Sequence, residues 1–418
     1  MTDLKIGFVG GGFIARFHLR ALESVRGVRV EALHSRTPPE ALAAEARSRG
    51  LGPAHLCSSI EELAAHVDVV ALLGPNATRL DALRRVIAAR DAGAPVRAVA
   101  CEKPLGRNLI EARAMHAEAH GAGIVHAYFE NQLHLKALLA ARAQLAALEQ
   151  RCGPPLLARA AEEHAGPHAA WFWDPRQQGG GVLSDMGCHS IALAWALLSP
   201  ASGDPLALVP VSVQCELALL KWGREPHRGA LRERFGIDYA QTPAEDYASG
   251  TIRFRDPRSK ALSLGQFSTS WMNDKQGLKL EFEALGAGYA CSFSSLRSPA
   301  EVFVADAAAS ALADQELALE KATTSRGTLP LQPNEPDLYG YVDEWQDLVQ
   351  ALASGREPRL SFRHGCEIAR LVMACYLSAE RGERIDLEDP LTAAALESYI
   401  PAIQRGLGAA QLLPQARR

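Results

Sequence analysis

Gly10-Gly11-Gly12-Phe13-Ile14-Ala15 follows a short apolar run at residues 5–9 and opens a helical pattern. The stretch has the form G-x-G-x-x-A: the first glycine permits a tight turn, the second lets backbone approach a pyrophosphate, and the alanine allows a helix to pack closely on a strand. The helix N-terminus adds N–H groups and a positive dipole that attract an anion. A glycine triplet can also be a flexible turn, but the flanking strand and helix favour a dinucleotide site. We expect its contacts from Gly10, Gly12, Phe13, Ile14 and Ala15.

The pattern that follows predicts two domains. Short β-branched runs alternate with Ala-rich helical stretches, as in βαβ units on a parallel sheet, at residues 5–9, 28–34, 67–72, 96–101 and 123–128. Longer strands, typical of a mostly antiparallel sheet, follow at residues 156–162, 211–220, 250–254, 262–270 and 278–284. We therefore expect an α/β fold, with a doubly wound Rossmann domain over residues 1–128 and an α+β domain with a large open sheet over residues 129–418.

Three further segments stand outside this scheme. A helical region at about 338–381 has apolar residues at helical spacing and could pack back on either domain. The segments 222–246 and 305–337 look like excursions from the core sheet.

Composition excludes several classes of function. The 418 residues include 48% hydrophobic and 22% charged residues and have a net charge of −4, so the chain lacks the basic footprint of a nucleic-acid or membrane-surface protein. No run of 18 apolar residues predicts a membrane span. The eight cysteines are scattered without zinc-ligand spacing. With no export signal recognised, we expect a cytoplasmic enzyme with reduced thiols and no metal.

The end of the second predicted strand bears on the choice of cofactor. NAD sites usually have an acidic residue there, which holds the ribose hydroxyls. This chain has Ser35, Arg36 and Thr37 and no acidic residue between positions 32 and 39. These side chains could receive a 2′-phosphate, which favours NADP over NAD. Arg36 could instead stack on the adenine.

Glu102-Lys103-Pro104 follows an apolar strand and so places a lysine at the carboxyl edge of the sheet, where α/β sites lie. Pro104 restricts its neighbour to extended geometry, which can aim the ammonium of Lys103 into a crevice. A lysine at a strand end is otherwise usually solvated.

A second signal is the run Gly179-Gly180-Gly181-Val182-Leu183-Ser184-Asp185-Met186-Gly187-Cys188-His189. If a helix begins near Leu183, Asp185 and His189 share one face of it. The carboxylate could then hold the imidazole by a hydrogen bond. The alternative is a helix cap together with a core histidine.

Taken together, these motifs resemble the Gfo/Idh/MocA family of oxidoreductases, named for glucose–fructose oxidoreductase, inositol dehydrogenase and rhizopine catabolism. The resemblance implies that Lys103, Asp185 and His189 are catalytic and that Glu102 orients the lysine or the nicotinamide ribose. It also implies that Pro75 and Asn76 line the nicotinamide side of the site.

The resemblance further implies that the open sheet forms a homo-oligomer, a dimer or a tetramer. One departure is that the family commonly has Pro-Asn-x-x-His where this chain has arginine as the last residue, Arg79. A cofactor contact by residue 79 is therefore in doubt.

The chemistry agrees with these assignments, because oxidation of an alcohol needs a base close to its oxygen. His189 or Lys103 can serve, and the ammonium can also stabilise a developing alkoxide. We expect an NAD(P)-dependent oxidoreductase that acts on a sugar, a glycoside or a cyclic polyol. Two alternatives are an NAD-dependent glycosidase that works by transient oxidation and elimination, and a non-enzymatic regulator that senses nucleotides.

Residues that could contact the substrate follow two strands. Glu130 could bind hydroxyls or be a solvated carboxylate at a domain hinge. His164, His168, Trp171 and Trp173, together with His189, could form a carbohydrate wall, whereas core packing is the alternative for the tryptophans. Gly166-Pro167 breaks any helix between the two histidines, which argues against a metal pair.

Overall fold

The computed structural model describes residues 3–275, 277–297, 301–304, 327–330 and 334–413. Its contacts divide the chain into two units. Unit 1 comprises Met1–Lys136 with Pro336–Ala369, and unit 2 comprises Ala137–Glu335 with Arg370–Arg418. Most of the expected excursion at 305–337 lies outside the described residues.

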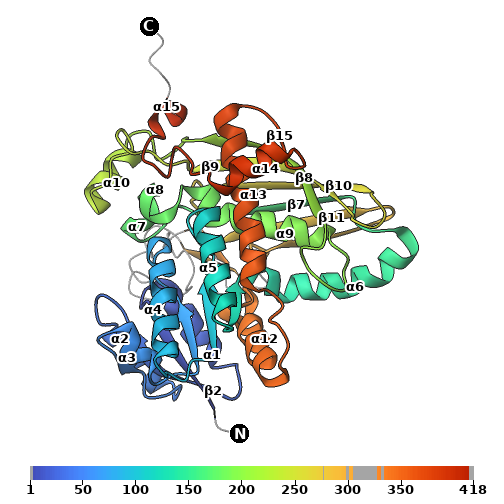
Figure 1. Cartoon of the computed structure of the whole chain (residues 1–418). Coiled ribbons are helices and arrows are strands. Elements are labelled where there is room, and N and C mark those ends of the chain that lie inside the picture. Colours follow the sequence, from blue (N-terminus) through green and yellow to red (C-terminus); the bar gives the residue numbers. More distant parts are fainter. Residues whose placement is uncertain (1–2, 276, 298–300, 305–326, 331–333, 414–418) are drawn as a thin grey trace. The chain divides into compact units, whose positions relative to one another are not determined.

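Unit 1 is built on a six-stranded sheet in the order β3-β2-β1-β4-β5-β6, with every pair of neighbours parallel (Figure 1). This confirms the predicted Rossmann fold. The strands are β1 (Leu4–Val9), β2 (Val28–His34), β3 (His55–Leu56), β4 (Val69–Leu72), β5 (Ala98–Glu102) and β6 (Val125–Phe129). The helices between them are α1 (Phe13–Leu22), α2 (Glu40–Ser48), α3 (Ile60–Ala64), α4 (Arg79–Asp91) and α5 (Leu109–Gly121), with short turns η1 (Asn76–Thr78) and η2 (Asn131–His134).

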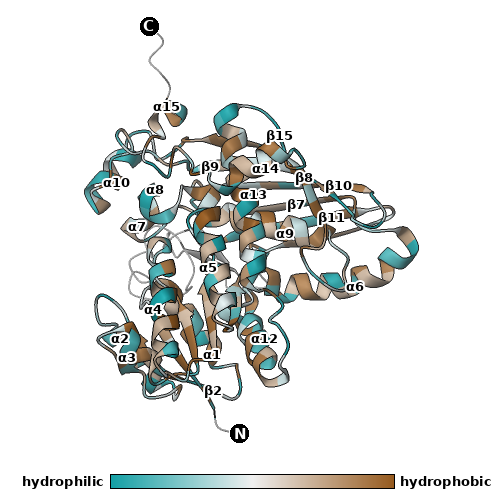
Figure 2. Cartoon of the chain, in the orientation of Figure 1, coloured by the Kyte–Doolittle hydropathy of each residue, from teal (hydrophilic) through white to brown (hydrophobic). Residues whose placement is uncertain are grey.

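The segment of unit 1 from the far end of the chain packs on α1. Helix α12 (Tyr341–Ser354) is amphipathic, as the brown and teal along it show in Figure 2. Its buried face includes Tyr341, which contacts the ring of Phe17 on α1 at a centroid distance of 5.1 Å, and Trp345, which is 0% exposed. The apolar residues of this late segment thus complete the core of unit 1.

Unit 2 is built on a seven-stranded sheet in the order β12-β11-β7-β10-β9-β8-β15. The pair β7 and β10 is parallel and the other pairs are antiparallel, which confirms the mostly antiparallel prediction. The strands are β7 (Leu157–Glu163), β8 (Val209–Ala218), β9 (Tyr247–Arg255), β10 (Leu262–Ser270), β11 (Lys279–Gly286), β12 (Tyr289–Ser294) and β15 (Ile385–Asp386). A separate pair joins β13 (Glu301–Val304) to β14 (Gly327–Pro330).

Helix α9 (Cys188–Leu198) covers one face of this sheet, since a Cβ on Gly265 of β10 would lie 3.4 Å from Ala194 and 3.6 Å from Leu198. The expected excursion 222–246 contains helix α10 (His227–Phe235), which is mostly teal in Figure 2. The remaining helical elements are α6 (Lys136–Cys152), α7 (Ala170–Trp173), α8 (Pro175–Gln178), η3 (Leu183–Gly187), α9 (Cys188–Leu198), α10 (His227–Phe235), α11 (Glu335–Leu338), α13 (Phe362–Arg381), α14 (Pro390–Glu397) and α15 (Ala409–Leu412).

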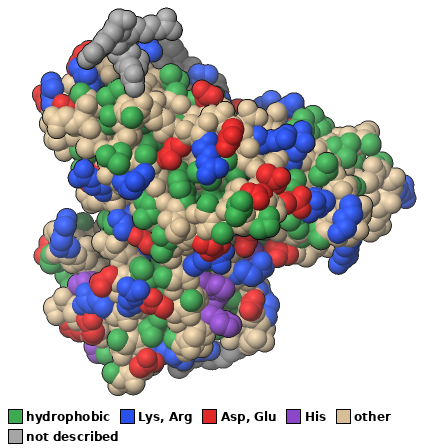
Figure 3. All heavy atoms as spheres, turned by 45° about the horizontal axis from the view of Figure 1, so that its top comes forward, with side chains coloured by type: hydrophobic (Ala, Val, Ile, Leu, Met, Phe, Trp, Pro, Cys, Tyr) green, Lys and Arg blue, Asp and Glu red, His purple; other side chains and the backbone are tan. Residues whose placement is uncertain are grey.

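By length and composition alone, the helical stretch Pro175–Leu198 could cross a membrane, and it is the one such stretch among the described residues. Its apolar window is wholly buried within the structure, as in the core helix of a soluble protein. On the face seen in Figure 3, Lys and Arg side chains are interspersed with Asp and Glu.

Candidate active site

The glycine turn lies between β1 and α1, as predicted. Gly10 has a φ of +113°, and a Cβ on it would lie 2.7 Å from the backbone of Leu73 and Gly74, so only glycine fits. Gly12 is exposed, and a Cβ on it would meet nothing within 4 Å. No side chain caps the first turn of α1, and Ala15 is fully buried. The turn therefore presents uncapped helix N–H groups beside open space, which fits a pyrophosphate.

The residues expected to choose the cofactor lie against this turn. A Cβ on Gly11 would lie 3.6 Å from the Cβ of Ser35, which follows the end of β2. Ser35 is half-buried, while Arg36 and Thr37 are exposed. Hydroxyl and guanidinium donors are thus available next to the dinucleotide turn.

The loop after β4 holds Pro75 and Asn76, and a buried arginine follows three residues after Asn76. Arg79, the first residue of α4, is 4% exposed. Its guanidinium donates to the carbonyl oxygens of Gly74 at 3.0 Å and of Glu102 at 2.6 Å, and also to that of Pro104. The arginine that replaces the family's histidine therefore joins the loop after β4 to the end of β5.

Glu102 is the last residue of β5 and Lys103 follows it, and Glu102 is the centre of a buried network. The indole Nε1 of Trp345 donates to Nδ1 of His18 at 2.9 Å, which leaves the proton of a neutral imidazole on Nε2. Nε2 lies 2.9 Å from Glu102 Oε1 and donates to it. Glu102 Oε2 accepts from the backbone N–H of Lys103 at 3.0 Å. The side chain of Lys103 is half-buried.

Charge within this network favours the carboxylate form of Glu102. Burial raises the pKa of Glu102, but the hydrogen bond from His18 and the charges of Lys103 and Arg79 lower it overall. Nearby Glu344 responds in the opposite direction, because burial and the charges of Glu102 and Glu130 raise its pKa well above the ordinary value. Glu130 is 0% exposed, so the alternative of a solvated hinge carboxylate is wrong.

His18 and Trp345 were missed by sequence reasoning. A signal for His18 was present, since it shares the buried face of α1 with Ala15, Leu19 and Leu22. Its partner Trp345 comes from the far end of the chain and could not be identified from spacing.

In unit 2, Asp185 and His189 follow the glycine run on consecutive helical elements. Leu183–Gly187 forms a π-helical turn, in place of the α-helix expected from Leu183, and Cys188–Leu198 continues as α9. Both side chains are at least nine-tenths buried. Single π turns inside helices are frequent at functional sites, so this irregularity favours a functional role for Asp185.

His164, expected as a substrate residue, lies beside Asp185. Its Nδ1 accepts from the backbone N–H of Gly166 at 2.9 Å, so the proton of the neutral ring is on Nε2. That nitrogen lies 4.0 Å from Asp185 Oδ2. Asp185 is therefore within reach of an imidazole other than that of His189, which the sequence did not predict.

The other aromatic candidates differ in their surroundings. His168 is exposed and Trp171 is half-buried, stacked on Phe172 at a centroid distance of 3.8 Å. Trp173 is 1% exposed and packs edge-on against Trp222 and Trp271. Core packing, the alternative weighed for the tryptophans, thus describes Trp173.

Three histidines of unit 1 lie close enough together to be considered as metal ligands. His116 and His120 on α5 and His126 on β6 each offer a ring nitrogen, and these atoms lie within 4.8 Å of one another. Nδ1 of His126 accepts from the backbone N–H of Phe362 at 3.2 Å, which keeps the proton on Nε2. Burial, with the charge of His116 next, lowers the pKa of His126 to about 4. Metal-bound histidines instead donate their second N–H, so we assign no metal here.

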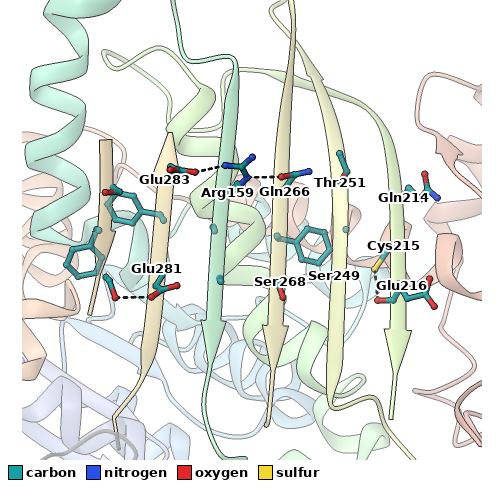
Figure 4. A pocket seen from close by; sticks show the side chains of 18 of the residues that line it. Arg159, Gln214, Cys215, Glu216, Ser249, Thr251, Gln266, Ser268, Glu281 and Glu283 are labelled. Carbon is teal, nitrogen blue, oxygen red and sulfur yellow. Dashed lines mark hydrogen bonds and ion pairs between the residues drawn. The ribbon is translucent and has the colours of Figure 1, made fainter. Parts of the chain in front are cut away.

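A hollow of about 740 Å³ lies on the seven-stranded sheet of unit 2 (Figure 4). Arg159 on β7 donates to Glu283 on β11 at 2.6 Å and to Gln266 on β10 at 3.0 Å, so polar side chains bridge neighbouring strands. None of the predicted catalytic, cofactor or substrate residues lines this hollow.

Comparison with family models covers most of the chain. Residues 4–129 match an oxidoreductase family with an NAD-binding Rossmann fold. Residues 139–287 match the GFO/IDH/MocA C-terminal domain.

A curated relative is the 1,5-anhydro-D-fructose reductase of Ensifer adhaerens, 32% identical over 209 residues. The match covers 49% of this chain and spans 59% of that relative's length.

Solved structures share the fold over 92% of this chain. GenD2 from gentamicin A biosynthesis, in complex with NAD, has a TM-score of 0.71 and 23% identity, with 97% of its chain covered. Levoglucosan dehydrogenase with NADH and L-sorbose has a TM-score of 0.67 and 22% identity, with 99% covered. A putative myo-inositol dehydrogenase from Sinorhizobium meliloti has a TM-score of 0.66 and 20% identity, with 99% covered. At these identities the likeness concerns the fold.

Proposed function

This chain belongs to the Gfo/Idh/MocA family of oxidoreductases, and we propose that it passes a hydride between a nicotinamide and a hydroxyl- or keto-bearing carbon of a sugar, a glycoside or a cyclic polyol. The observation that carries the proposal is the arrangement at the carboxyl edge of the unit 1 sheet. The strands β1, β4 and β5 are neighbours in this sheet. The glycine turn follows β1, Pro75-Asn76 follow β4, and Glu102-Lys103 lie at the end of β5. The strand order reverses between β1 and β4, where α/β sheets bind ligands.

The names of similar proteins support the substrate class. The curated relative is a reductase of 1,5-anhydro-D-fructose, and one structural neighbour is a levoglucosan dehydrogenase. We extend this class to the present chain as part of the proposal, without a choice of sugar or carbon.

In this mechanism, residues of the chain accept or return the proton of the substrate hydroxyl. When bound, the nicotinamide accepts or returns the hydride. Lys103 or His189 takes the proton of the substrate hydroxyl as the carbon–hydrogen bond breaks, and the Lys103 ammonium stabilises the developing alkoxide. Asp185 orients the imidazole. The Trp345–His18–Glu102 network holds the backbone at Lys103, which fixes where the lysine side chain begins.

We expect Lys103→Ala to lower turnover by about 100-fold or more, because general acid–base groups contribute about that much. Binding of the reduced cofactor, measured by fluorescence titration, should stay nearly intact. His189→Ala should behave similarly and Asp185→Asn should show a smaller loss. Lys275→Ala, at an exposed lysine, is the matched control. Turnover of Lys103→Ala close to wild type with a responsive sugar would refute the assignment.

The same proposal includes a preference for NADP over NAD, carried by Ser35, Arg36 and Thr37. A planar guanidinium next to hydroxyl donors suits a 2′-phosphate. Replacing Ser35 by Asp and Arg36 by Ala should reverse the preference, with a loss of about 10- to 100-fold in NADP affinity, since a charge-assisted contact contributes about 1.5–3 kcal/mol. Calorimetric titration of both cofactors decides this. A wild type that prefers NAD, with no change in the double variant, would mean that Arg36 stacks on adenine.

We also propose a cytoplasmic homo-oligomer that associates through the unit 2 sheet. All eight cysteines are free thiols, as expected in a reducing compartment. Leu262 and Leu264 on β10 are 57% and 39% exposed. They are even-numbered, on the opposite face of β10 from Gly265, which faces α9. An uncovered sheet face with exposed leucines suits a second copy of the chain.

A further inference from the structure

The segment 222–246, which the proposed function does not use, is anchored at its end by two neighbouring carboxylates. Asp246 accepts from the backbone N–H groups of Leu220, Lys221 and Trp222, each at 2.7 Å. The chain is therefore fastened where it leaves the sheet after β8 and where it returns at β9. The side chain of Glu245, the residue before Asp246, binds a different part of the chain.

Glu245 binds the glycine run that precedes Asp185. Its Oε1 accepts from the backbone N–H groups of Gly181 at 2.9 Å and Leu183 at 3.1 Å. The phenolic hydroxyl of Tyr376 on α13 donates to the same oxygen at 2.7 Å. The backbone oxygen of Glu245 accepts from Val182 at 3.0 Å. Three consecutive amides of the run are thus held by one residue, which is 0% exposed.

The two glycines at this point are explained by the same contacts. A Cβ on Gly180 would overlap the hydroxyl of Tyr376, and a Cβ on Gly181 would overlap the backbone oxygen of Glu245. The backbone must approach both groups closely, so glycine is required at each position.

Leu183, the last amide held, is the first residue of the π turn, and Asp185 follows two residues later. We propose that Glu245, backed by Tyr376, is a positioning residue that fixes the π-helical turn and thereby the carboxylate of Asp185. This inference rests on the proposed roles of Asp185 and His189. It gives the segment 222–246 a function, because that segment delivers the clamping residue to the start of the catalytic helix.

The second carboxyl oxygen of Glu245 allows the positioning role to be tested by substitution. Glu245 Oε2 is buried without a hydrogen-bond partner among the described residues. Glu245→Gln keeps an oxygen in the place of Oε1, so the three donors keep their acceptor. Glu245→Ala removes that acceptor, and Tyr376→Phe removes one donor and leaves the two amide bonds.

The first readout is hydrogen exchange at the amides of Gly181 and Leu183, which needs no substrate. In Glu245→Ala we expect both to exchange about 10- to 100-fold faster, since both amides lose their acceptor. Glu245→Gln should stay within about threefold of wild type. Glu233→Ala, at an exposed glutamate of the same segment, is the control.

The second readout is turnover. A displacement of about 1 Å can cost about 100-fold in rate, so kcat of Glu245→Ala should fall by about that factor while cofactor affinity, set in unit 1, is unchanged. Glu245→Gln should restore most of it. Unchanged exchange and turnover in Glu245→Ala would overturn the inference. If Glu245→Ala does not fold, Tyr376→Phe must show a smaller shift of the same kind, and wild-type exchange and kcat there would overturn it as well.

Failure of the proposed function has a different signature. If His189→Ala keeps its turnover, the catalytic assignment fails, whatever the exchange rates show. If His189→Ala is inactive and Glu245→Ala has wild-type kcat, the positioning role alone fails.

Discussion

The buried carboxyl of Glu245 makes the folding stability of the protein depend on pH. Burial raises its pKa to about 7 from the ordinary value of 4.5, although the hydrogen bonds from Tyr376 and from the amides of Gly181 and Leu183 act to lower it. The folded chain therefore keeps this proton to a higher pH than the unfolded chain does. The stabilising contribution of the carboxyl is complete below pH about 4.5 and is lost as pH rises through about 7.

This predicts a pH dependence that Glu245→Gln removes. Between pH 5.5 and 8, the wild type should lose about 2 kcal/mol of unfolding free energy relative to Glu245→Gln, because each unit of pKa difference corresponds to about 1.4 kcal/mol. Urea unfolding of both proteins at the two pH values, followed by tryptophan fluorescence, measures the difference. The comparison is internal, so other titrating groups cancel. A difference that stays constant with pH would show that Glu245 is ionised throughout or that its pKa is ordinary.

At the scale of elements, Arg79 fastens two loops that carry different parts of the site. Its guanidinium reaches carbonyl oxygens after β4 and at the end of β5, and the single ammonium of lysine cannot match this planar fork. Arg79→Lys should lower unfolding free energy by about 2 kcal/mol, the value of a hydrogen bond to a charged group, and should weaken cofactor binding. Arg84→Lys on the same helix, with a side chain 55% exposed, should be nearly silent in thermal and calorimetric assays. Equal behaviour of the two variants would contradict the fastening role.

Some of the helices and strands could be predicted from the sequence and others could not. The strands of the parallel sheet were placed to within a few residues because β4 and β5 are buried throughout and read as continuous apolar runs. The two-residue strands β3 and β15 carry too short a pattern to detect. The π turn was predicted as α-helix, since its amides are held by Glu245, more than sixty residues later. The glycine turn and Glu102-Lys103 were recognisable because their neighbours in sequence determine their geometry.

At the scale of the whole molecule, the sheet of unit 2 makes the proposal of assembly testable. Replacing Leu262 and Leu264 by glutamate would place charges on the face proposed to meet a second copy, where desolvation opposes them. We expect sedimentation velocity to show a shift from oligomer to monomer in the double variant. Leu391→Glu, at a leucine 80% exposed on α14, is the control and should keep the assembly state of the wild type. An oligomer unaffected by both substitutions would place the interface elsewhere.

The composition of unit 1 from Met1–Lys136 and Pro336–Ala369 has a consequence for synthesis on the ribosome. The indole that holds His18 belongs to Trp345, so the buried network around Glu102 cannot close until that residue has been made. At roughly 5–20 residues per second, the intervening chain takes on the order of tens of seconds to appear. During this interval the face of α1 that later meets α12 lacks its cover. A nascent chain arrested before Trp345 should therefore expose a nucleotide-binding unit that is open to proteases and chaperones, although its sheet is already complete in sequence.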